Sequence, residues 1–215
     1  MTIVLNRAKT TAPAAADSLW TDVTPEAARR LLVAAIATFA DRGYHATTTR
    51  DIASRAAMSP AAVYIHYPTK EDLLYRIVVT GHRRALAVIK DAVQGMADPP
   101  ERIAAIVRTF ARWYATHSTT AHVITRERGA LAPGHLAEVA GLRQQMELII
   151  RDTVAQGVVD GVFAVPDVPG ATRAVMSLVS DIPRWFGDQD QQTADQVADL
   201  YSTLTLQMLG CSRKI

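Results

Sequence analysis

This chain has little of what several large classes of protein are built from. Its single cysteine, Cys211, excludes a disulfide framework and a zinc site made of thiolates. The longest apolar run, residues 31–40, is far too short to cross a bilayer. No apolar segment follows the basic residues near the N-terminus, so we expect no secretory signal and no membrane partner. These features predict a protein of the reducing cytoplasm.

The motifs of common enzymes are also missing. The chain has no G-x-x-x-x-G-K-[ST] phosphate loop, no G-x-S-x-G nucleophile turn and no H-E-x-x-H zinc motif. Its six histidines are scattered, and His117 and His122 are five residues apart, which puts them on different faces of a helix. We therefore expect no catalytic site, no metal site and no cofactor.

Composition is that of an ordinary globular protein. The 215 residues are 49% hydrophobic, enough for a sizeable core. The formal net charge is only +2, so total charge alone does not indicate a nucleic-acid partner. An argument for DNA binding must therefore depend on where the basic residues lie.

The segment 47–70 is typical of two very short helices joined by a tight corner. Thr48 can cap the first helix, with Asp51 at its third position completing a capping box. Ser59 and Pro60 then begin the second helix, because serine caps free N–H groups and proline suits the first helical position. This pattern predicts a helix-turn-helix, whose second helix lies in the major groove of DNA.

An ordinary helical hairpin buried in an all-α protein is the alternative. The second helix, residues 60–67, begins with the small side chains of Ala61 and Ala62, where a core helix would have leucine or isoleucine. Small side chains let a backbone approach another surface closely, which favours the DNA-reading interpretation.

The same region resembles the N-terminal DNA-binding signature of the TetR family of bacterial transcriptional regulators. The resemblance covers roughly residues 24–77, and the family's usual corner glycine is Ala57 here. The residues that carry it are Phe39, Gly43, Tyr44, Thr47, Thr48, Asp51, Ile52, Ala53, Ser59, Val63, Tyr64, His66, Tyr67, Lys70, Leu73 and Leu74. It implies a cytoplasmic bacterial regulator that binds double-stranded DNA.

We expect an all-α fold of two domains. Residues 1–23 lack periodicity and are predicted to form a mobile tail; residues 24–70 would form the three-helix DNA-binding domain, and residues 71–215 a larger helical domain for effector binding and dimerisation. Its last two helices are predicted at about 171–186 and 193–209.

DNA contacts are predicted on both short helices. Arg50 is the candidate for a bidentate bond to guanine, because it is the long, fork-shaped donor of that surface. The resemblance implies that Tyr64, His66 and Lys70 hold backbone phosphates. The full predicted set is Thr48, Arg50, Ser59, Pro60, Ala61, Ala62, Tyr64, His66 and Lys70.

The last two helices carry wide apolar faces, which indicate either a subunit interface or closure of the monomer's own core. We expect a homodimer that reads a palindromic operator, since one helix-turn-helix binds DNA poorly and the family pairs its last two helices. The predicted interface residues are Val175, Val179, Ile182, Val197, Leu200, Tyr201, Leu204 and Met208.

A mostly apolar effector is predicted for the larger domain, although such residues could also simply pack on one another. The predicted pocket residues are Phe110, Trp113, Tyr114, His117, Arg126, Arg128, Met146, Ile149, Ile150, Met176, Arg184 and Trp185. The run 184–186 also resembles regulators of lipid and sterol breakdown in actinobacteria. That resemblance implies a fatty or steroid acid, or its coenzyme A thioester, held by Arg126, Arg128 or Arg184.

These features predict a repressor that an effector releases from its operator. Two alternatives stay open: a dimeric DNA-binding protein without an effector, and a helical small-molecule carrier whose helix-turn-helix no longer reads DNA.

Overall fold

The computed structural model describes residues 19–187 and 192–211, and helices are the regular secondary structure of those ranges. In chain order they are α2 (Glu26–Arg42), α3 (Thr49–Arg55), α4 (Pro60–His66), α5 (Lys70–Ala92), α6 (Pro99–Thr116), α7 (Ser118–Glu127), the 3-10 turn η1 (Arg128–Ala130), α8 (Pro133–Val159), α9 (Val168–Ser180), α10 (Ile182–Trp185) and α11 (Ala194–Met208). The predicted all-α fold is confirmed. None of the described helices is both long and apolar enough to cross a membrane.

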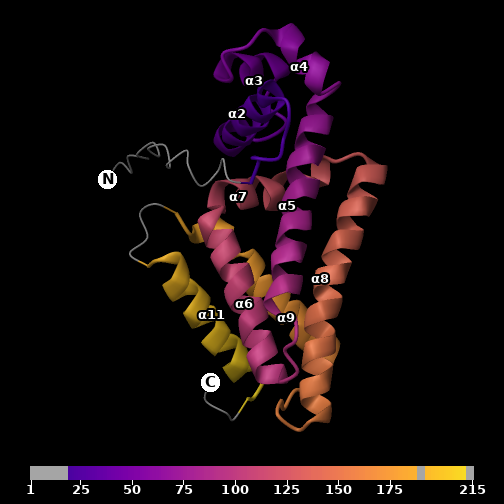
Figure 1. Cartoon of the computed structure of the whole chain (residues 1–215), viewed down its shortest axis with the longest axis vertical. Coiled ribbons are helices and arrows are strands. Elements are labelled where there is room, and N and C mark those ends of the chain that lie inside the picture. Colours follow the sequence, from indigo (N-terminus) through magenta and orange to yellow (C-terminus); the bar gives the residue numbers. More distant parts are fainter. Residues whose placement is uncertain (1–18, 188–191, 212–215) are drawn as a thin grey trace, which may run out of the picture.

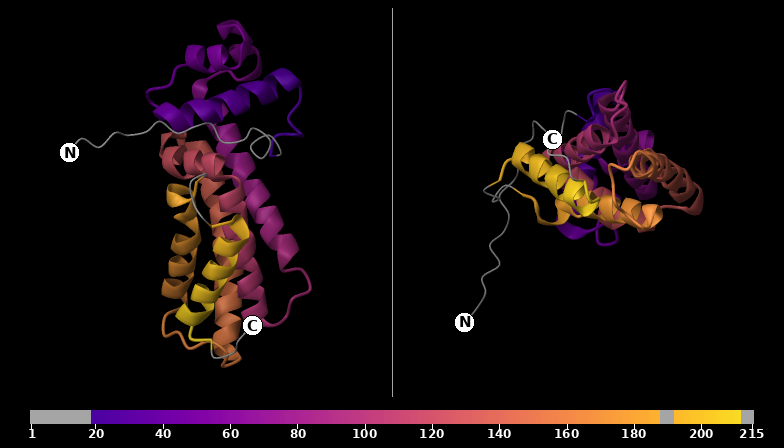
Figure 2. Two further views of the ribbon diagram at one scale, coloured as in Figure 1. Left: turned by 90° about the vertical axis from the view of Figure 1, so that its left-hand side faces the viewer. Right: turned by 90° about the horizontal axis from the view of Figure 1, so that it is seen from below.

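The helices form a small head and a longer body (Figure 1). The head consists of α2, α3 and α4, and α5 runs from it down into the body, where it contacts α6, α7 and α8. Helix α7 lies beneath the head and contacts α2, while α11 packs along α6 on the outside of the body (Figure 2). The predicted domain boundary at residue 70 thus falls at the start of α5, the helix that joins the two parts.

Local capping fixes the helix starts of the head as the sequence predicts. The Thr48 hydroxyl accepts from the Asp51 N–H at 3.2 Å, and the Asp51 carboxylate accepts from the Thr48 N–H at 2.8 Å. The same reciprocal pair recurs between Thr69 and Asp72 at the start of α5, and Ser59 caps α4. Each such cap stabilises its helix by about 1 kcal/mol, which matters most for α3 and α4 because they are short.

The predicted mobile tail was wrong at its end. Leu19, Trp20 and Val23 are buried in the core, Trp20 fully. Residues 1–18 of the predicted tail lie outside the described residues. Helix α2 begins at Glu26 after Pro25, and no side chain caps its first turn.

The C-terminal helices are also divided differently from the prediction. The expected helix at 171–186 is two helices, α9 and α10, which are separated at Asp181; Pro183 lies in the first turn of α10, where it removes no helical hydrogen bond. Helix α8 runs past Gly157 to Val159, so Gly157 does not break it. A Cβ atom at Gly157 would lie 2.1 Å from Phe163, so glycine is needed there for the closing loop to pack.

The corner of the helix-turn-helix holds a strained residue. Ala57 has φ of 53°, and among the described residues it is the one non-glycine residue in the left-handed region. We expect Ala57→Gly to raise the free energy of unfolding by about 1 kcal/mol, since the Cβ atom is what disfavours that conformation. Denaturant titration measures this change. Ala46→Gly, at an exposed position without positive φ, should instead lower the free energy of unfolding. Equal effects of both substitutions would contradict the strain at Ala57.

Candidate DNA interface and ligand-binding domain

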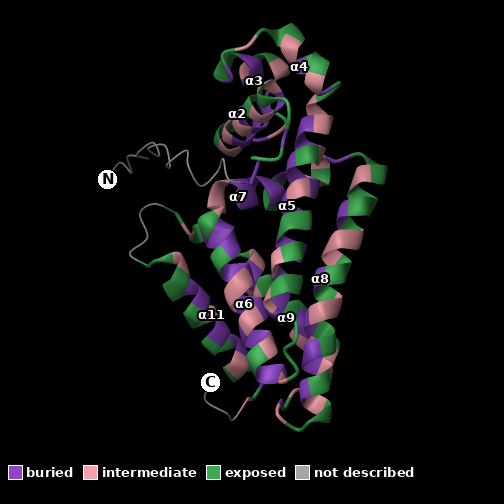
Figure 3. Cartoon of the chain, in the orientation of Figure 1, coloured by how far each residue is buried: buried purple, intermediate pink, exposed green. Residues whose placement is uncertain are grey.

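The outer face of the head is formed by α3 and α4. Ile52 and Ala53 of α3 and Val63 of α4 are fully buried beneath it, which fixes both short helices against α2. The tip of α4 is exposed (Figure 3), and its Tyr64 hydroxyl lies 3.0 Å from the Thr49 hydroxyl of α3. This bond connects the two helices on the outer face.

Arg50 is the free cation of this face. It is exposed near the start of α3 and makes no ion pair or hydrogen bond with any described residue. Its neighbours differ, because Arg42 pairs with Asp51 and Arg55 pairs with Asp41 on the side of the head. The guanidinium of Arg50 therefore remains available to a partner.

Lys70 has a role that the sequence did not predict. Its ammonium donates to the carbonyls of Tyr44 and Thr47 at 2.8 and 2.7 Å, and it lies 4.2 Å from the centre of the Tyr44 ring. Burial lowers the pKa of this lysine. Two of its three N–H bonds thus hold the turn between α2 and α3, which leaves one for a phosphate.

The remaining predicted DNA residues lie around the same tip. Pro60, Ala61 and Tyr64 are exposed, Ala62 and His66 are half-buried, and the exposed Thr48 and Ser59 each accept a capping N–H. Sequence reasoning missed Ile65, whose side chain is 77% exposed beside Tyr64. Its position four residues after Ala61, on the same face of a short helix, was the available signal.

Half of the predicted dimer residues lie inside the monomer. Val175, Val179, Ile182 and Val197 have no exposed surface, so assigning them to a subunit interface was wrong. The reason is that the helices that carry them, α9, α10 and α11, all contact α6 within the monomer.

A second apolar strip remains on the surface of α10 and α11. Leu200, Leu204 and Met208 follow one another at four-residue spacing and are 42%, 40% and 42% exposed. Trp185, 38% exposed, stacks on the half-buried Tyr201 with ring centres 6.2 Å apart. This outer strip, defined by these five residues, is the part of the prediction that can face a partner.

Most of the predicted pocket residues are packed in the core of the body. Phe110, Met146 and Ile150 are almost completely buried. Trp113, Tyr114 and Met176 are also buried but keep slightly more exposed surface, and His117 is half-buried. Ile149 lines a second pocket of about 300 Å³ with Met96 and Arg102. One chamber lined by all of these residues stays a prediction.

Two of the three predicted arginines point away from the interior. Arg184 is exposed and forms a bidentate pair with Asp181, at 2.7 and 3.0 Å. Arg126 is exposed and pairs with its neighbour Glu127 at 3.2 Å. Assigning Arg126, Arg184 and the partly exposed Trp185 to a pocket was wrong, because their side chains extend from the outer surfaces of α7 and α10.

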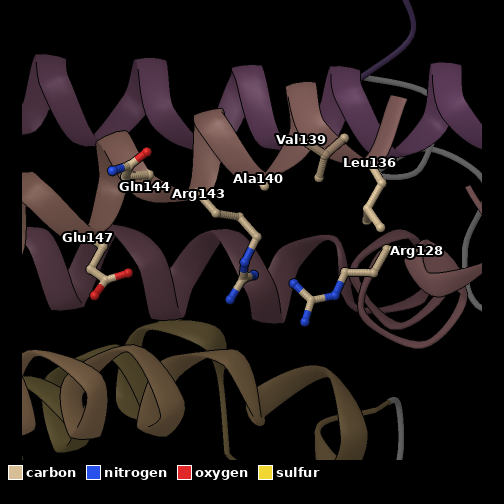
Figure 4. Close-up of a pocket in the computed structure, with 7 residues that line it drawn as sticks. All are labelled: Arg128, Leu136, Val139, Ala140, Arg143, Gln144 and Glu147. Atoms are coloured by element: carbon tan, nitrogen blue, oxygen red, sulfur yellow. The ribbon is translucent and has the colours of Figure 1, made fainter. Parts of the chain in front are cut away.

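Arg128 does line a pocket, which has a volume of about 210 Å³. Figure 4 shows its lining residues, with the guanidinium groups of Arg128 and Arg143 pointing toward each other. The other lining residues are Leu136, Val139, Ala140, Gln144 and Glu147. Its walls thus combine an aliphatic end with two cations.

The two cations of this pocket have no direct ion pair. Neither the Arg128 nor the Arg143 side chain makes an ion pair or hydrogen bond with a described residue, and burial together with Arg128 lowers the pKa of Arg143. Burial, aided by the charges of Arg143 and Arg128, lowers the pKa of His82 in α5 to about 4. His82 is thus neutral at physiological pH. The exposed Glu147 carboxylate is the acidic group of the same pocket and partly offsets the charge of Arg143. Two half-buried cations that share the pocket with one acidic group still favour an anion.

A cluster of potential metal ligands joins the body to the first turn of α5. Glu71, Asp72 and His135 each place one ligand atom within 4.8 Å of the others. These side chains already make other contacts, however. The Glu71 carboxylate accepts from the Ala132 N–H at 2.8 Å and lies 3.0 Å from the His135 ring nitrogen, while Asp72 caps α5. The cluster acts as a structural link between α5 and α8.

Known proteins match both parts of the chain. Residues 31–77 match the family model for bacterial regulatory proteins of the tetR family, and residues 96–209 match the tetracyclin repressor-like C-terminal domain. The transcriptional repressor KstR2 of Mycobacterium tuberculosis is 27% identical over 178 residues, which are 82% of this chain and 89% of the relative.

Solved structures agree with these matches. A TetR-family regulatory protein from Rhodococcus RHA1 is 38% identical, covers 88% of this chain and 100% of its own, and has a TM-score of 0.84. The ketosteroid transcriptional regulator KstR2 of Mycobacterium tuberculosis has a TM-score of 0.81 at 26% identity and covers 90% of this chain and 98% of its own. This chain therefore belongs to the TetR family of bacterial transcriptional regulators, which are DNA-binding proteins and not enzymes.

Proposed function

We propose that this protein is a cytoplasmic dimeric repressor that an acidic, mostly apolar small molecule releases from a palindromic operator. The observation that carries the proposal is the pair of guanidinium groups, Arg128 and Arg143, which make no direct ion pair and outnumber the single carboxylate, Glu147, in a pocket whose other end is aliphatic. A fatty or steroid acid, or its coenzyme A thioester, supplies the two complementary parts. The similarity to KstR2, named a ketosteroid regulator, supports this class of ligand.

Binding at this pocket can reach the head through a short path. Arg128 directly follows Glu127, the last residue of α7, and α7 contacts α2. A Cβ atom at Gly43, which ends α2, would lie 3.4 Å from Arg126 and 3.5 Å from Glu127. A ligand that draws Arg128 inward would therefore move the end of α7 against the head. By linkage, DNA and ligand then weaken each other's affinity by the same factor.

Arg143 provides the test of the ligand site. We expect Arg143→Met to weaken ligand-induced release from DNA by about 10- to 100-fold, because a charge-assisted hydrogen bond is lost. The ligand-free variant should also be more stable, since one of two repelling, partly buried charges is gone. Titration of protein–operator complexes with acyl-coenzyme A and free fatty acids measures release, and thermal unfolding measures stability.

The matched control is Arg151→Met, because Arg151 lies on the same helix, is 50% exposed and pairs with Asp152. It should leave release unchanged. If no acid or thioester releases the unmodified protein, the effector-free alternative is favoured; the close packing around Phe110 and Met146 is the observation that would then explain it.

On the DNA, we propose that Arg50 reads a base and that Lys70 acts mainly by holding the turn before α3. Arg50→Ala should cost about 1–3 kcal/mol at one base position of the operator while leaving the thermal midpoint unchanged. Lys70→Ala should lower the thermal midpoint and weaken specific and random DNA alike, because its two carbonyl partners lose their donor. Quantitative gel shifts on both kinds of DNA, with thermal unfolding, separate the two roles. Equal losses from Arg50→Ala on both DNAs would contradict base reading.

For the dimer, we propose that the outer strip of α10 and α11 pairs with its copy, so that two α4 helices reach successive major grooves about 34–36 Å apart. We expect Leu204→Glu to weaken dimerisation at least about 100-fold, because an unpaired carboxylate would be buried at the interface. Sedimentation measures the dissociation constant. Val159→Glu, at a 79% exposed position near the end of α8, is the control and should stay dimeric. A monomeric unmodified protein at micromolar concentration would rule the dimer out.

A further inference from the structure

The proposed reading helix α4 lacks the side chains that most often make bidentate bonds to bases. Its seven residues are Pro60–His66, with the sequence PAAVYIH, and they include no arginine, lysine, asparagine or glutamine. Those four residue types make the common bidentate bonds to guanine and adenine in the major groove. Base discrimination by α4 must therefore use another chemistry.

Its polar groups are few, and two of them are already engaged. The Tyr64 hydroxyl is 3.0 Å from that of Thr49, the Ser59 hydroxyl caps the helix, and His66 is half-buried at its C-terminal end. What remains on the outer face is aliphatic: the Ala61 methyl and, four residues later, the Ile65 side chain, 77% exposed.

One feature of the major groove is complementary to an aliphatic side chain. The C5-methyl group of thymine is the apolar part of the base edges there, and apolar side chains read it by direct contact. Binding is stabilised when such an apolar surface covers an isoleucine that is otherwise exposed to water on a groove-facing helix.

We infer that Ile65 is a specificity-determining residue that contacts a thymine C5-methyl group in each operator half-site. Arg50 of α3 then reads its base by hydrogen bonding, and α4 reads by shape and apolar contact. The inference uses the DNA binding of the family and is independent of the effector, the pocket and the arginine pair.

The test removes that methyl group alone. An operator is first selected from random-sequence DNA with the full-length protein, and each thymine of a half-site is then replaced by deoxyuridine, which keeps every hydrogen-bonding group. At one position, deoxyuridine should weaken the unmodified protein about fourfold per half-site, the value of one buried methyl group. The Ile65→Ala variant should bind thymine and deoxyuridine equally at that position.

Val159→Ala is the matched control, because Val159 is also a β-branched residue, 79% exposed, at the far end of α8. It should keep the full sensitivity to deoxyuridine. A selected operator that binds tightly but loses nothing with any deoxyuridine, or loses as much with Ile65→Ala, overturns the inference while DNA binding stands. Failure to select any sequence would instead contradict sequence-specific binding itself, and the inference with it.

Discussion

The continuous apolar face of α5 is the contact on which the rest of the structure depends. Leu73, Leu74, Ile77 and Val78 are completely buried, and the helix that carries them contacts α2 near its start and α6, α7 and α8 further along. Because the hydrogen bonds of one helix run without interruption through this region, the head cannot move independently of the first turns of α5. The link from Glu71 to His135 adds a polar tie between the same helix and α8.

The features that could be predicted from the sequence are those that depend on a few adjacent residues. The capping box of Thr48 and Asp51 and the proline at the start of α4 act over three or four positions, so the helix starts of the head were correct. The break at Asp181 and the burial of Trp20 depend on tertiary packing. Neither leaves a periodic pattern in the chain, because a short turn is stabilised by what it packs against.

The same limit explains the two surfaces of the body. Val197 and Leu204 of α11 are seven positions apart and so lie on nearly the same side of the helix, and the sequence does not say that Val197 packs inward while Leu204 stays outside. For the pocket, the prediction kept Arg128 but missed Arg143, which is fifteen positions away on another helix. A charged residue on a long helix is usually solvated, so only the fold reveals that these two line one pocket without a direct ion pair.

The short side chains of α4 also set how costly it is for the protein to hold its DNA. Alanine loses no rotamer freedom on burial, isoleucine loses little, and Tyr64 is already restrained by its bond to Thr49. A reading helix with lysines or glutamines would have to immobilise each flexible chain, at about 0.5–1.5 kcal/mol apiece. Little conformational entropy therefore remains for α4 to lose on binding. In the proposed complex α4 would meet the groove as a rigid surface, and a displacement of that helix by the body could not be absorbed by rearranging its side chains.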